Sequence, residues 1–162
     1  MANWHRVLVS DKISQRALET LKKNNIDFDY KPDCGTSDSL EEVIEPYSGL
    51  IIRSASKVSR DVIDRGKNLQ VIGRAGIGVD NIDLKAASSK GIVVMNTPHG
   101  NAITTAEHTL AMIFASCRQI PAADHSTQQG TWEKSKFMGQ ELTGKTLGLI
   151  GVGNIGSIVA DR

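Results

Sequence analysis

The stretch LQVIGRAGIGVDNIDLKAASSKGIVV, residues 69–94, contains one complete structural repeat of the chain. An apolar run from Leu69 to Ile72 precedes a glycine-rich turn, and a second run from Ile92 to Val94 follows the segment from Asp83 to Lys90. Both runs are rich in Ile, Val and Leu rather than alternating with polar residues, which is typical of strands buried on both faces. We therefore predict a strand, a helix that ends at Gly91 and a second, parallel strand.

The same repeat extends outward over the first part of the chain. Apolar runs are centred near positions 7, 28, 50, 71 and 93, at intervals of 21 or 22 residues. Such an interval accommodates a strand of about five residues, a helix of about ten and two short loops. The spacing predicts an α/β fold in which residues 1–97 form a doubly wound, flavodoxin-like domain around a parallel sheet. Helices are expected at 13–23, around 40–44, from 59 to 66 and at 83–90.

The segment from Asn96 to Gly100 interrupts this repeat, because it places a proline and a glycine close together. We place a domain boundary there and assign residues 98–162 to the incomplete beginning of a second domain. A long helix is expected next, with Asn101 as its N-cap. From Leu110 to Ala115 this helix is apolar on every side. Such a helix is normally buried between layers or between subunits.

Composition excludes several classes of protein. Lys and Arg number 19 against 18 Asp and Glu, and a net charge of +1 provides no basic surface for nucleic acid. Charged residues interrupt the first twenty positions, so neither a signal peptide nor a membrane span is expected, and we predict a cytoplasmic protein. Cys34 and Cys117 lie far apart with no neighbouring ligand residues, which argues against a disulfide framework or a bound metal.

Two arginines follow neighbouring strands of the predicted sheet. Arg53 comes directly after Leu50 to Ile52, and Arg74 comes directly after Val71 to Gly73. Ligands collect at the carboxyl ends of parallel strands, and guanidinium groups bind carboxylates or phosphates through two hydrogen bonds. The glycine turn from Ala75 to Gly78 would bring backbone N–H groups to the same place. The alternatives are ordinary surface ion pairs for the arginines and a purely structural turn.

A glycine motif near the end of the chain fits the dinucleotide fingerprint G-x-G-x-x-G. It runs from Gly151 to Gly156, after a predicted strand at 146–150 and before a predicted helix that begins near Ser157. That context is the one in which the fingerprint binds a pyrophosphate at a helix N-terminus, as in a Rossmann domain. The third glycine would let the helix pack on the strand. A structural glycine turn is the alternative.

Several motifs, in order, resemble those of the D-isomer-specific 2-hydroxyacid dehydrogenases. They are Arg53 to Val58, Gly73 to Asp83, Asn96 to Asn101, Ala106 to His108 and Gly151 to Gly156. Within that family, Trp132 to Gly139 followed by Glu141 to Thr146 is most similar to the phosphoglycerate branch, which serves serine biosynthesis. The resemblance covers the whole chain. It implies an NAD-dependent oxidoreductase with a substrate or lid domain, a Rossmann NAD-binding domain, and a dimeric or tetrameric assembly.

The resemblance also implies roles for individual residues. The hydroxyacid would be held by Arg53, Ser54, Arg74, Gly76, Ile77 and Asn101. The cofactor would be held by Ile77, Thr105, Gly151, Gly153, Asn154, Ile155 and Gly156. Many relatives carry a small polar residue where Ile77 stands, and the side chain of Ile77 offers no hydrogen bond. Lys134 and Lys136 would add positive charge for a substrate phosphate, in the partner subunit's site; the alternative is a solvated basic pair.

The acidic residue that selects NAD over NADP is expected about 20 positions after the fingerprint. Only six residues follow Gly156, and by the resemblance the catalytic Arg, Glu and His also lie further on. We therefore assign no catalytic residue and expect an N-terminal portion of an enzyme that is inactive alone. Other hydroxyacid dehydrogenases, acting on glyoxylate, hydroxypyruvate or lactate, and non-catalytic nucleotide-sensing relatives are the alternatives.

Overall fold

A computed structural model describes residues 6–162, apart from the side chains of residues 37 and 38. The chain divides into two compact units, the first ending at Gly100 and the second running from Asn101 to Arg162. The first five residues of the predicted domain 1–97 lie outside the described residues. Assignment of the first unit to substrate and of the second to cofactor stays a prediction.

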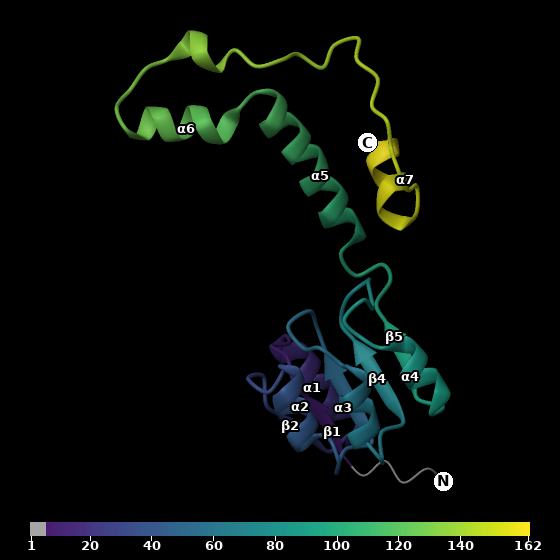
Figure 1. The fold of residues 1–162 in the computed structure, drawn as a ribbon. Coiled ribbons are helices and arrows are strands. Elements are labelled where there is room, and N and C mark those ends of the chain that lie inside the picture. The colour runs from purple at the N-terminus through teal and green to yellow at the C-terminus, as the bar shows by residue number, and fades with distance from the viewer. Residues whose placement is uncertain (1–5) are drawn as a thin grey trace. The chain divides into compact units, whose positions relative to one another are not determined.

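The first unit contains a parallel sheet of five strands in the order β2-β1-β3-β4-β5 (Figure 1). This is the flavodoxin-like order, and it confirms the predicted fold class. Each strand lies within or next to one of the apolar runs found in the sequence. The strands are β1 (Val7–Val9), β2 (Phe28–Tyr30), β3 (Gly49–Ile52), β4 (Val71–Arg74) and β5 (Val93–Asn96).

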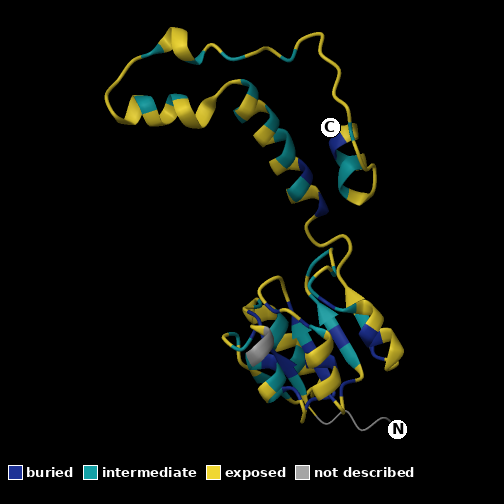
Figure 2. Ribbon diagram, viewed as in Figure 1, coloured by how far each residue is buried: buried dark blue, intermediate teal, exposed yellow. Residues whose placement is uncertain are grey.

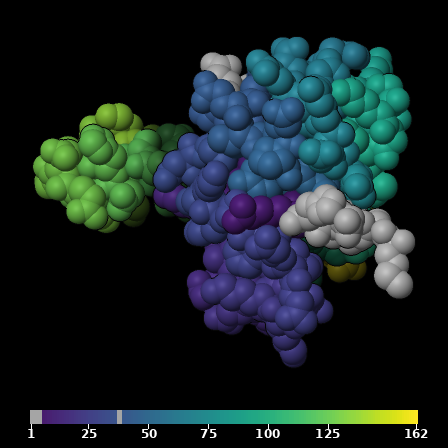
Figure 3. All heavy atoms as spheres, turned by 90° about the horizontal axis from the view of Figure 1, so that it is seen from below, coloured from purple at the N-terminus to yellow at the C-terminus, as the bar shows by residue number. Residues whose placement is uncertain are grey.

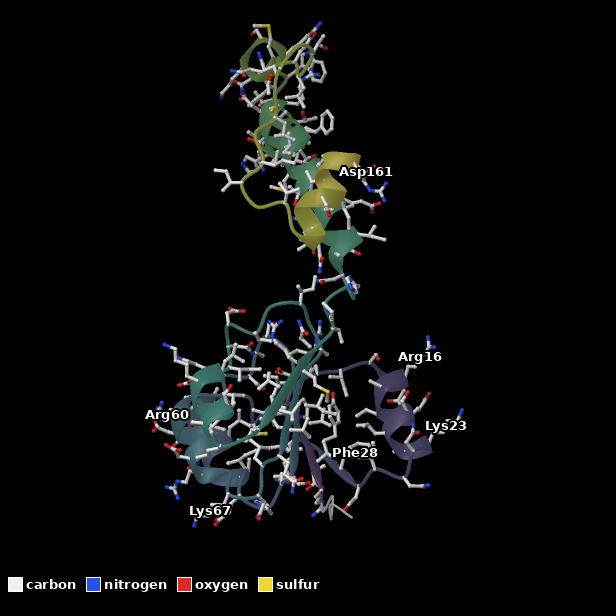
Figure 4. The ribbon with its side chains drawn as sticks, turned by 90° about the vertical axis from the view of Figure 1, so that its right-hand side faces the viewer. Arg16, Lys23, Phe28, Arg60, Lys67 and Asp161 are labelled. Carbon is white, nitrogen blue, oxygen red and sulfur yellow. The ribbon has the colours of Figure 1, made fainter. Side chains whose placement is uncertain are left out.

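Four helices connect the strands and cover both faces of the sheet. They are α1 (Gln15–Lys23), α2 (Ser37–Val43), α3 (Arg60–Arg65) and α4 (Leu84–Ser89). The connection from β1 leads to β2 at one edge of the sheet, whereas the later connections lead toward β5 at the other edge. Right-handed crossovers therefore place α1 on one face of the sheet and α2, α3 and α4 on the other. Figure 4 shows α1, with Arg16 and Lys23, across the sheet from α3, with Arg60. In the space-filling view, α1 and α4 also lie at opposite sides of the unit (Figure 3).

Local sequence signals begin three of these helices and end one of them. The hydroxyls of Ser14 and Ser59 accept the capping hydrogen bonds of α1 and α3, and Asp83 Oδ1 accepts from Ala86 N (2.9 Å) at the start of α4. Each cap satisfies a backbone N–H that the helix itself leaves unpaired. Gly91 follows α4 with a φ of +70°, a backbone conformation that glycine adopts without strain. The predicted helix boundaries at Ser59 and Gly91 are therefore confirmed.

The hydrophobic core fills the space between the sheet and α2, α3 and α4. Leu8, Leu50 and Ile72 extend into it from three neighbouring strands, and each is at most 1% exposed (Figure 2). Burial of one such side chain contributes about 1.5–3 kcal/mol to folding. The core fixes the register of the strands and thereby the positions of the residues at their ends.

The opposite face of the sheet is only partly covered. Val93 and Met95 of β5 are 56% and 55% exposed, and β5 is largely yellow in Figure 2. An apolar groove of about 590 Å³ runs along this face from Leu21 of α1 over Ile51 and Val71 to Met95. The edge strand β5 and its neighbour β4 therefore present an apolar surface on this side, which we call the open sheet face.

The second unit contains helices and irregular segments. Its elements are α5 (Ala102–Cys117), α6 (Ile120–Gln128), the 3₁₀ helix η1 (Lys134–Phe137) and α7 (Asn154–Asp161). Helices α5 and α7 pack against each other, burying Ala106 and Val159. Arg162 Nη2 forms an ion pair with Glu107 Oε1 (3.0 Å). Pro121 lies in the first turn of α6, where the helix itself offers no partner for a backbone N–H.

One expectation for this unit was wrong. Residues 146–150 do not form a strand, and Ile150 is fully exposed, because a strand needs a hydrogen-bonded neighbour and the described residues of this unit include none. Helix α5 packs against α6 and α7 and leaves Met112 and Phe114 52% and 55% exposed. Its burial between layers or between subunits therefore stays a prediction. Asn101 stands at the N-cap position of α5, but its side chain makes no capping hydrogen bond.

Candidate functional site

The carboxyl ends of β3, β4 and β5 form the candidate substrate edge. In the sheet register Ile52 pairs with Arg74, and Arg74 pairs with Asn96. Arg53 follows Ile52 directly, and Ala75 N donates to Ile52 O (2.8 Å). The two arginines therefore come from adjacent positions on neighbouring strands, as the sequence predicts.

Neither arginine is neutralised by a carboxylate among the described side chains. Arg53 Nη1 donates to the backbone oxygen of Lys12 (3.2 Å), whereas Arg74 Nε is buried and has no hydrogen-bond partner in the described structure. A guanidinium carries five N–H donors in a fixed fork. The ion-pair alternative is thus not supported, and both groups can donate to an anion.

The glycine turn from Ala75 to Gly78 lies beside Arg74 and is held by the end of β5. Thr97 N donates to Gly76 O (2.9 Å), and Asn96 Nδ2 donates to Ile77 O (2.7 Å). A side-chain carbon added at Gly76 would collide with Arg74 Nη1. The guanidinium of Arg74 therefore packs directly on the turn, and glycine at 76 leaves the space that it occupies.

The loop from Arg53 to Ser56 is fixed by side chains that come from elsewhere in the unit. Asp11 Oδ2 accepts hydrogen bonds from Arg53 N and Ser56 N, the latter at 3.2 Å. Asn81 Nδ2 donates to Arg53 O and Ser56 O, each at 2.7 Å. The buried hydroxyls of Ser10 and Ser56 form a further hydrogen bond of 2.8 Å. We call this arrangement the loop clamp.

Asp11 and Asn81 have structural roles that the sequence analysis missed. A signal for Asp11 was present: it follows the first apolar run at nearly the position that Arg53 holds after the third. Asn81 offered no such signal, because it lies beyond the glycine turn rather than at a strand end. Its role depends on the folded path of the chain.

Apart from Ile77, the predicted cofactor residues lie in the second unit. Gly151 has a φ of +91°, and Gly156 is so close to the carbonyl oxygen of Gly151 that a Cβ at 156 would collide with it. Gly153 is the N-cap of α7, its added Cβ would meet no atom within 4 Å, and Asn154 and Ile155 begin the helix. The turn thus leaves room for a phosphate group at a helix N-terminus. The prediction that Gly156 lets the helix pack on a strand was wrong, because the atom packed against Gly156 is the carbonyl oxygen of Gly151 in the preceding turn.

The other predicted residues of this unit lie on α5 and η1. Asn101 is exposed at the start of α5, and Thr105 Oγ1 donates to Asn101 O (2.8 Å). Lys136 Nζ lies 3.1 Å from Glu133 Oε2 and 5.5 Å from the ring centre of Phe137. The hydrogen bond from Lys136, followed by one from Ser126, lowers the pKa of Glu133. Lys134 is exposed beside them.

Arg53, Ser54, Arg74, Gly76 and Ile77 thus belong to the first unit, and all other predicted site residues belong to the second. Among the described residues, no cluster of His, Cys, Asp or Glu is arranged to hold a metal ion, and no helix is long and apolar enough to span a bilayer. What the first unit offers is an edge rich in hydrogen-bond donors, suited to an anionic small molecule.

A flavodoxin-like sheet with an arginine-lined edge, followed by a glycine fingerprint at a helix N-terminus, defines a class of α/β proteins that bind anionic substrates and dinucleotides. The chain belongs to the D-isomer specific 2-hydroxyacid dehydrogenase family. The catalytic-domain model of that family matches residues 7–156.

Known proteins show the same relationship. D-3-phosphoglycerate dehydrogenase from Archaeoglobus fulgidus is 48% identical over 157 residues, which cover 97% of this chain and 30% of the relative. The TT0316 protein from Thermus thermophilus superimposes with a TM-score of 0.85 at 34% identity, over 97% of this chain and 52% of that chain. NAD-dependent formate dehydrogenase from Staphylococcus aureus, in complex with NAD, gives a TM-score of 0.84 at 26% identity, with the same coverage. The chain therefore spans less than a third of the Archaeoglobus relative's length.

Proposed function

We propose that this chain functions as part of an NAD-dependent D-3-phosphoglycerate dehydrogenase, which oxidises 3-phosphoglycerate to 3-phosphohydroxypyruvate in serine biosynthesis. The observation that carries the proposal is the 48% identity to the Archaeoglobus enzyme, which extends through both units of the chain. The Trp132 to Gly139 segment, which resembles the phosphoglycerate branch, supports the same substrate. We further propose a cytoplasmic enzyme.

In this proposal the first unit holds the substrate. The guanidinium groups of Arg53 and Arg74 bind its negatively charged groups, and the backbone of Gly76 and Ile77 takes the carboxylate. For this the Gly76 N–H must give up its hydrogen bond to Arg74 O (2.9 Å). Ser54, exposed in the loop after β3, adds a hydroxyl donor. Anions bind well at such a place because charged and backbone donors are fixed before the ligand arrives. Asn101, which lies in the second unit, is the remaining predicted substrate residue.

The residues of the fingerprint fit a dinucleotide. The open space at Gly153 and the N-terminus of α7 would receive the pyrophosphate, with Asn154 and Ile155 in the first turn. Thr105 and Ile77 would lie near the nicotinamide end. A bound nicotinamide would supply the acceptor for the hydride that leaves C2 of the substrate. This chain's residues bind and orient; the groups that move protons are expected further along the protein.

We also propose a homo-oligomer, a dimer or tetramer. Met112 and Phe114 on α5 are more than half exposed although the surrounding sequence is apolar, and such surfaces are typically covered by another element or subunit. Lys134 and Lys136 would then serve a neighbouring subunit's substrate phosphate. Sedimentation of the full-length protein measures the assembly directly.

The test compares substrates on the full-length protein that contains this chain. With NAD present, 3-phosphoglycerate is expected to give NADH at a kcat/KM far above that of unphosphorylated hydroxyacids such as lactate. A preference for lactate or another unphosphorylated hydroxyacid, or in the reverse direction for NADH-dependent reduction of glyoxylate or hydroxypyruvate, would reassign the substrate within the family. Binding of NAD without turnover on any of them would indicate a nucleotide sensor. The 162-residue chain alone is expected to show no turnover, and NADH production by it would contradict the assignment of the proton-transferring groups.

A further inference from the structure

The loop clamp contains a buried carboxylate whose role is not explained by folding of the core. Asp11 is only 2% exposed, and none of the described side chains forms an ion pair with it. A buried charge is costly unless hydrogen bonds compensate it. Its compensation comes from two backbone N–H groups of one short loop, those of Arg53 and Ser56. The carboxylate therefore stabilises one particular conformation of that loop.

The clamp holds the loop at both of its ends and leaves the middle open. The N–H groups of Arg53 and Ser56 are held by Asp11, and the C=O groups of the same two residues are held by Asn81. Ser54 and Ala55, between them, are exposed. Every backbone hydrogen-bonding group of residues 53 and 56 is thus fixed by a side chain, whereas the exposed tip keeps its own groups for a ligand.

Further contacts fix the clamp itself. Val58 N donates to Asn81 O (2.8 Å), and Lys57 N donates to Gly35 O (3.1 Å). A Cβ at Gly35 would lie 2.9 Å from Ser56 Oγ and 3.4 Å from Asp11 Oδ1, so the β2–α2 connection packs closely against the clamp. The loop is consequently connected to the end of β1, to the β2–α2 connection and to the segment beyond the glycine turn, and it cannot change conformation without breaking several of these bonds.

We propose that Asp11 is a positioning residue: through the backbone of Arg53 and Ser56 it fixes the loop that presents the Arg53 guanidinium and Ser54 to the substrate. Asn81 supports the same loop from its other side. The inference rests on the proposed function, in which Arg53 and Ser54 bind the hydroxyacid. Its physical basis is preorganisation, since a loop that is already ordered loses less conformational entropy when the ligand binds.

The experiment uses the full-length enzyme and separates substrate affinity from folding. Asp11→Ala removes the oxygen that accepts both hydrogen bonds. It is expected to raise KM for the hydroxyacid about tenfold, the factor that corresponds to losing one hydrogen bond to a charged group. NADH affinity, measured by fluorescence titration, is expected to stay within about twofold, because the fingerprint lies in the other unit. Asp11→Asn retains an acceptor oxygen of the same shape and is expected to restore most of the lost affinity.

Asp83→Ala is the matched control, because it removes an aspartate that also accepts from a backbone N–H, that of Ala86, at a helix start. It is expected to lower the melting temperature without changing KM. If Asp11→Ala behaves in the same way, lowering the melting temperature with KM unchanged, the positioning role is overturned. Should Asp11→Ala fail to fold, Asn81→Ala removes the donors on the other side of the loop, and it must raise KM for the proposal to stand.

Arg53→Ala distinguishes failure of this inference from failure of the proposed function. If Arg53→Ala raises KM and Asp11→Ala does not, the loop binds substrate but Asp11 does not position it. If neither substitution changes KM for any hydroxyacid tested, the loop is not a substrate site, and both proposals fall. If both raise KM, and Asp11→Asn restores it, both stand.

Discussion

Arg74 Nη1 lies over the α-carbon of Gly76, in the space that a side-chain carbon at position 76 would need. The two residues belong to one strand–turn segment, and Gly76 N also donates to Arg74 O (2.9 Å). The position of the guanidinium is therefore determined by the absence of a side chain two residues later. This relationship connects a backbone feature to the direction in which a charged group points.

Gly76→Ala is expected to displace the Arg74 guanidinium while leaving the fold intact. The group that must move is the end of a flexible side chain, so the free energy of unfolding should change by less than about 1 kcal/mol. In the full-length enzyme, KM for the hydroxyacid should rise about tenfold or more, since a bidentate contact depends on direction. Steady-state kinetics with a thermal melt measure both quantities. Gly78→Ala, at the far end of the turn, should change KM less.

Gly156→Ala is expected to act differently, because the atom in its way is the backbone carbonyl oxygen of Gly151. A backbone cannot rotate aside as a side chain does, so the fingerprint turn must distort, at a cost of about 1–3 kcal/mol. NADH titration of the full-length protein should show a large loss of affinity. Gly148→Ala is the control, since a Cβ at 148 meets no atom within 4 Å. Equal NADH affinity in the two variants would contradict this account of the turn.

Ile72→Ala is expected to be strongly destabilising. Ile72 is fully buried in the central part of the sheet, and large-to-small changes at such positions cost about 2–5 kcal/mol through lost contacts and the cavity left behind. Urea unfolding of the wild-type and variant chains measures the difference. Ile26→Ala removes the same side chain at a position that is 40% exposed, and it should cost much less. Similar midpoints for the two variants would show that Ile72 is not in a packed core.

Tyr47 should make stability depend on alkaline pH. Burial, followed by the hydrogen bond that its hydroxyl donates to Asp29 Oδ2 (2.6 Å), raises the pKa of Tyr47 to about 12. The unfolded chain releases this proton near pH 10, so the stabilisation is complete below about pH 10 and is lost as pH rises toward 12. Tyr47→Phe should flatten the decline in unfolding free energy over that range.

The pKa itself can be read by absorbance of the phenolate. The chain contains two tyrosines, so Tyr30→Phe leaves Tyr47 as the one that titrates. A midpoint near pH 10, the ordinary pKa of a tyrosine, in the folded Tyr30→Phe chain would contradict the proposed burial and hydrogen bond.

The first unit could be predicted largely from the sequence, because its signals are local and repeat along the chain. Apolar runs at a constant interval indicated the strands, and residues such as Ser59 and Gly91 marked where helices begin or end. The shared position of Arg53 and Arg74 followed from the rule that parallel strands end at one edge. These inferences required no knowledge of which side chains touch.

What failed, or was missed, depends on contacts between distant parts of the chain. The Asp11 to Arg53 hydrogen bond joins residues 42 positions apart, and no local pattern specifies it. The 146–150 segment has the composition of a strand, but a strand exists only when a neighbour supplies hydrogen bonds. The exposure of Phe114 also depends on a neighbouring element. Apolar composition indicates that a surface tends to be covered, but it does not indicate which element covers it.

The open sheet face has a practical consequence for work with the first unit. Val93 and Met95 expose apolar side chains to water. At high protein concentration such a surface favours self-association of this unit. Exchanging these two for threonine and lysine would give crystallisation and ligand screening a better-behaved sample. The two substitutions would leave the guanidinium groups of Arg53 and Arg74 unchanged, because these residues lie at the strand ends rather than on the open sheet face.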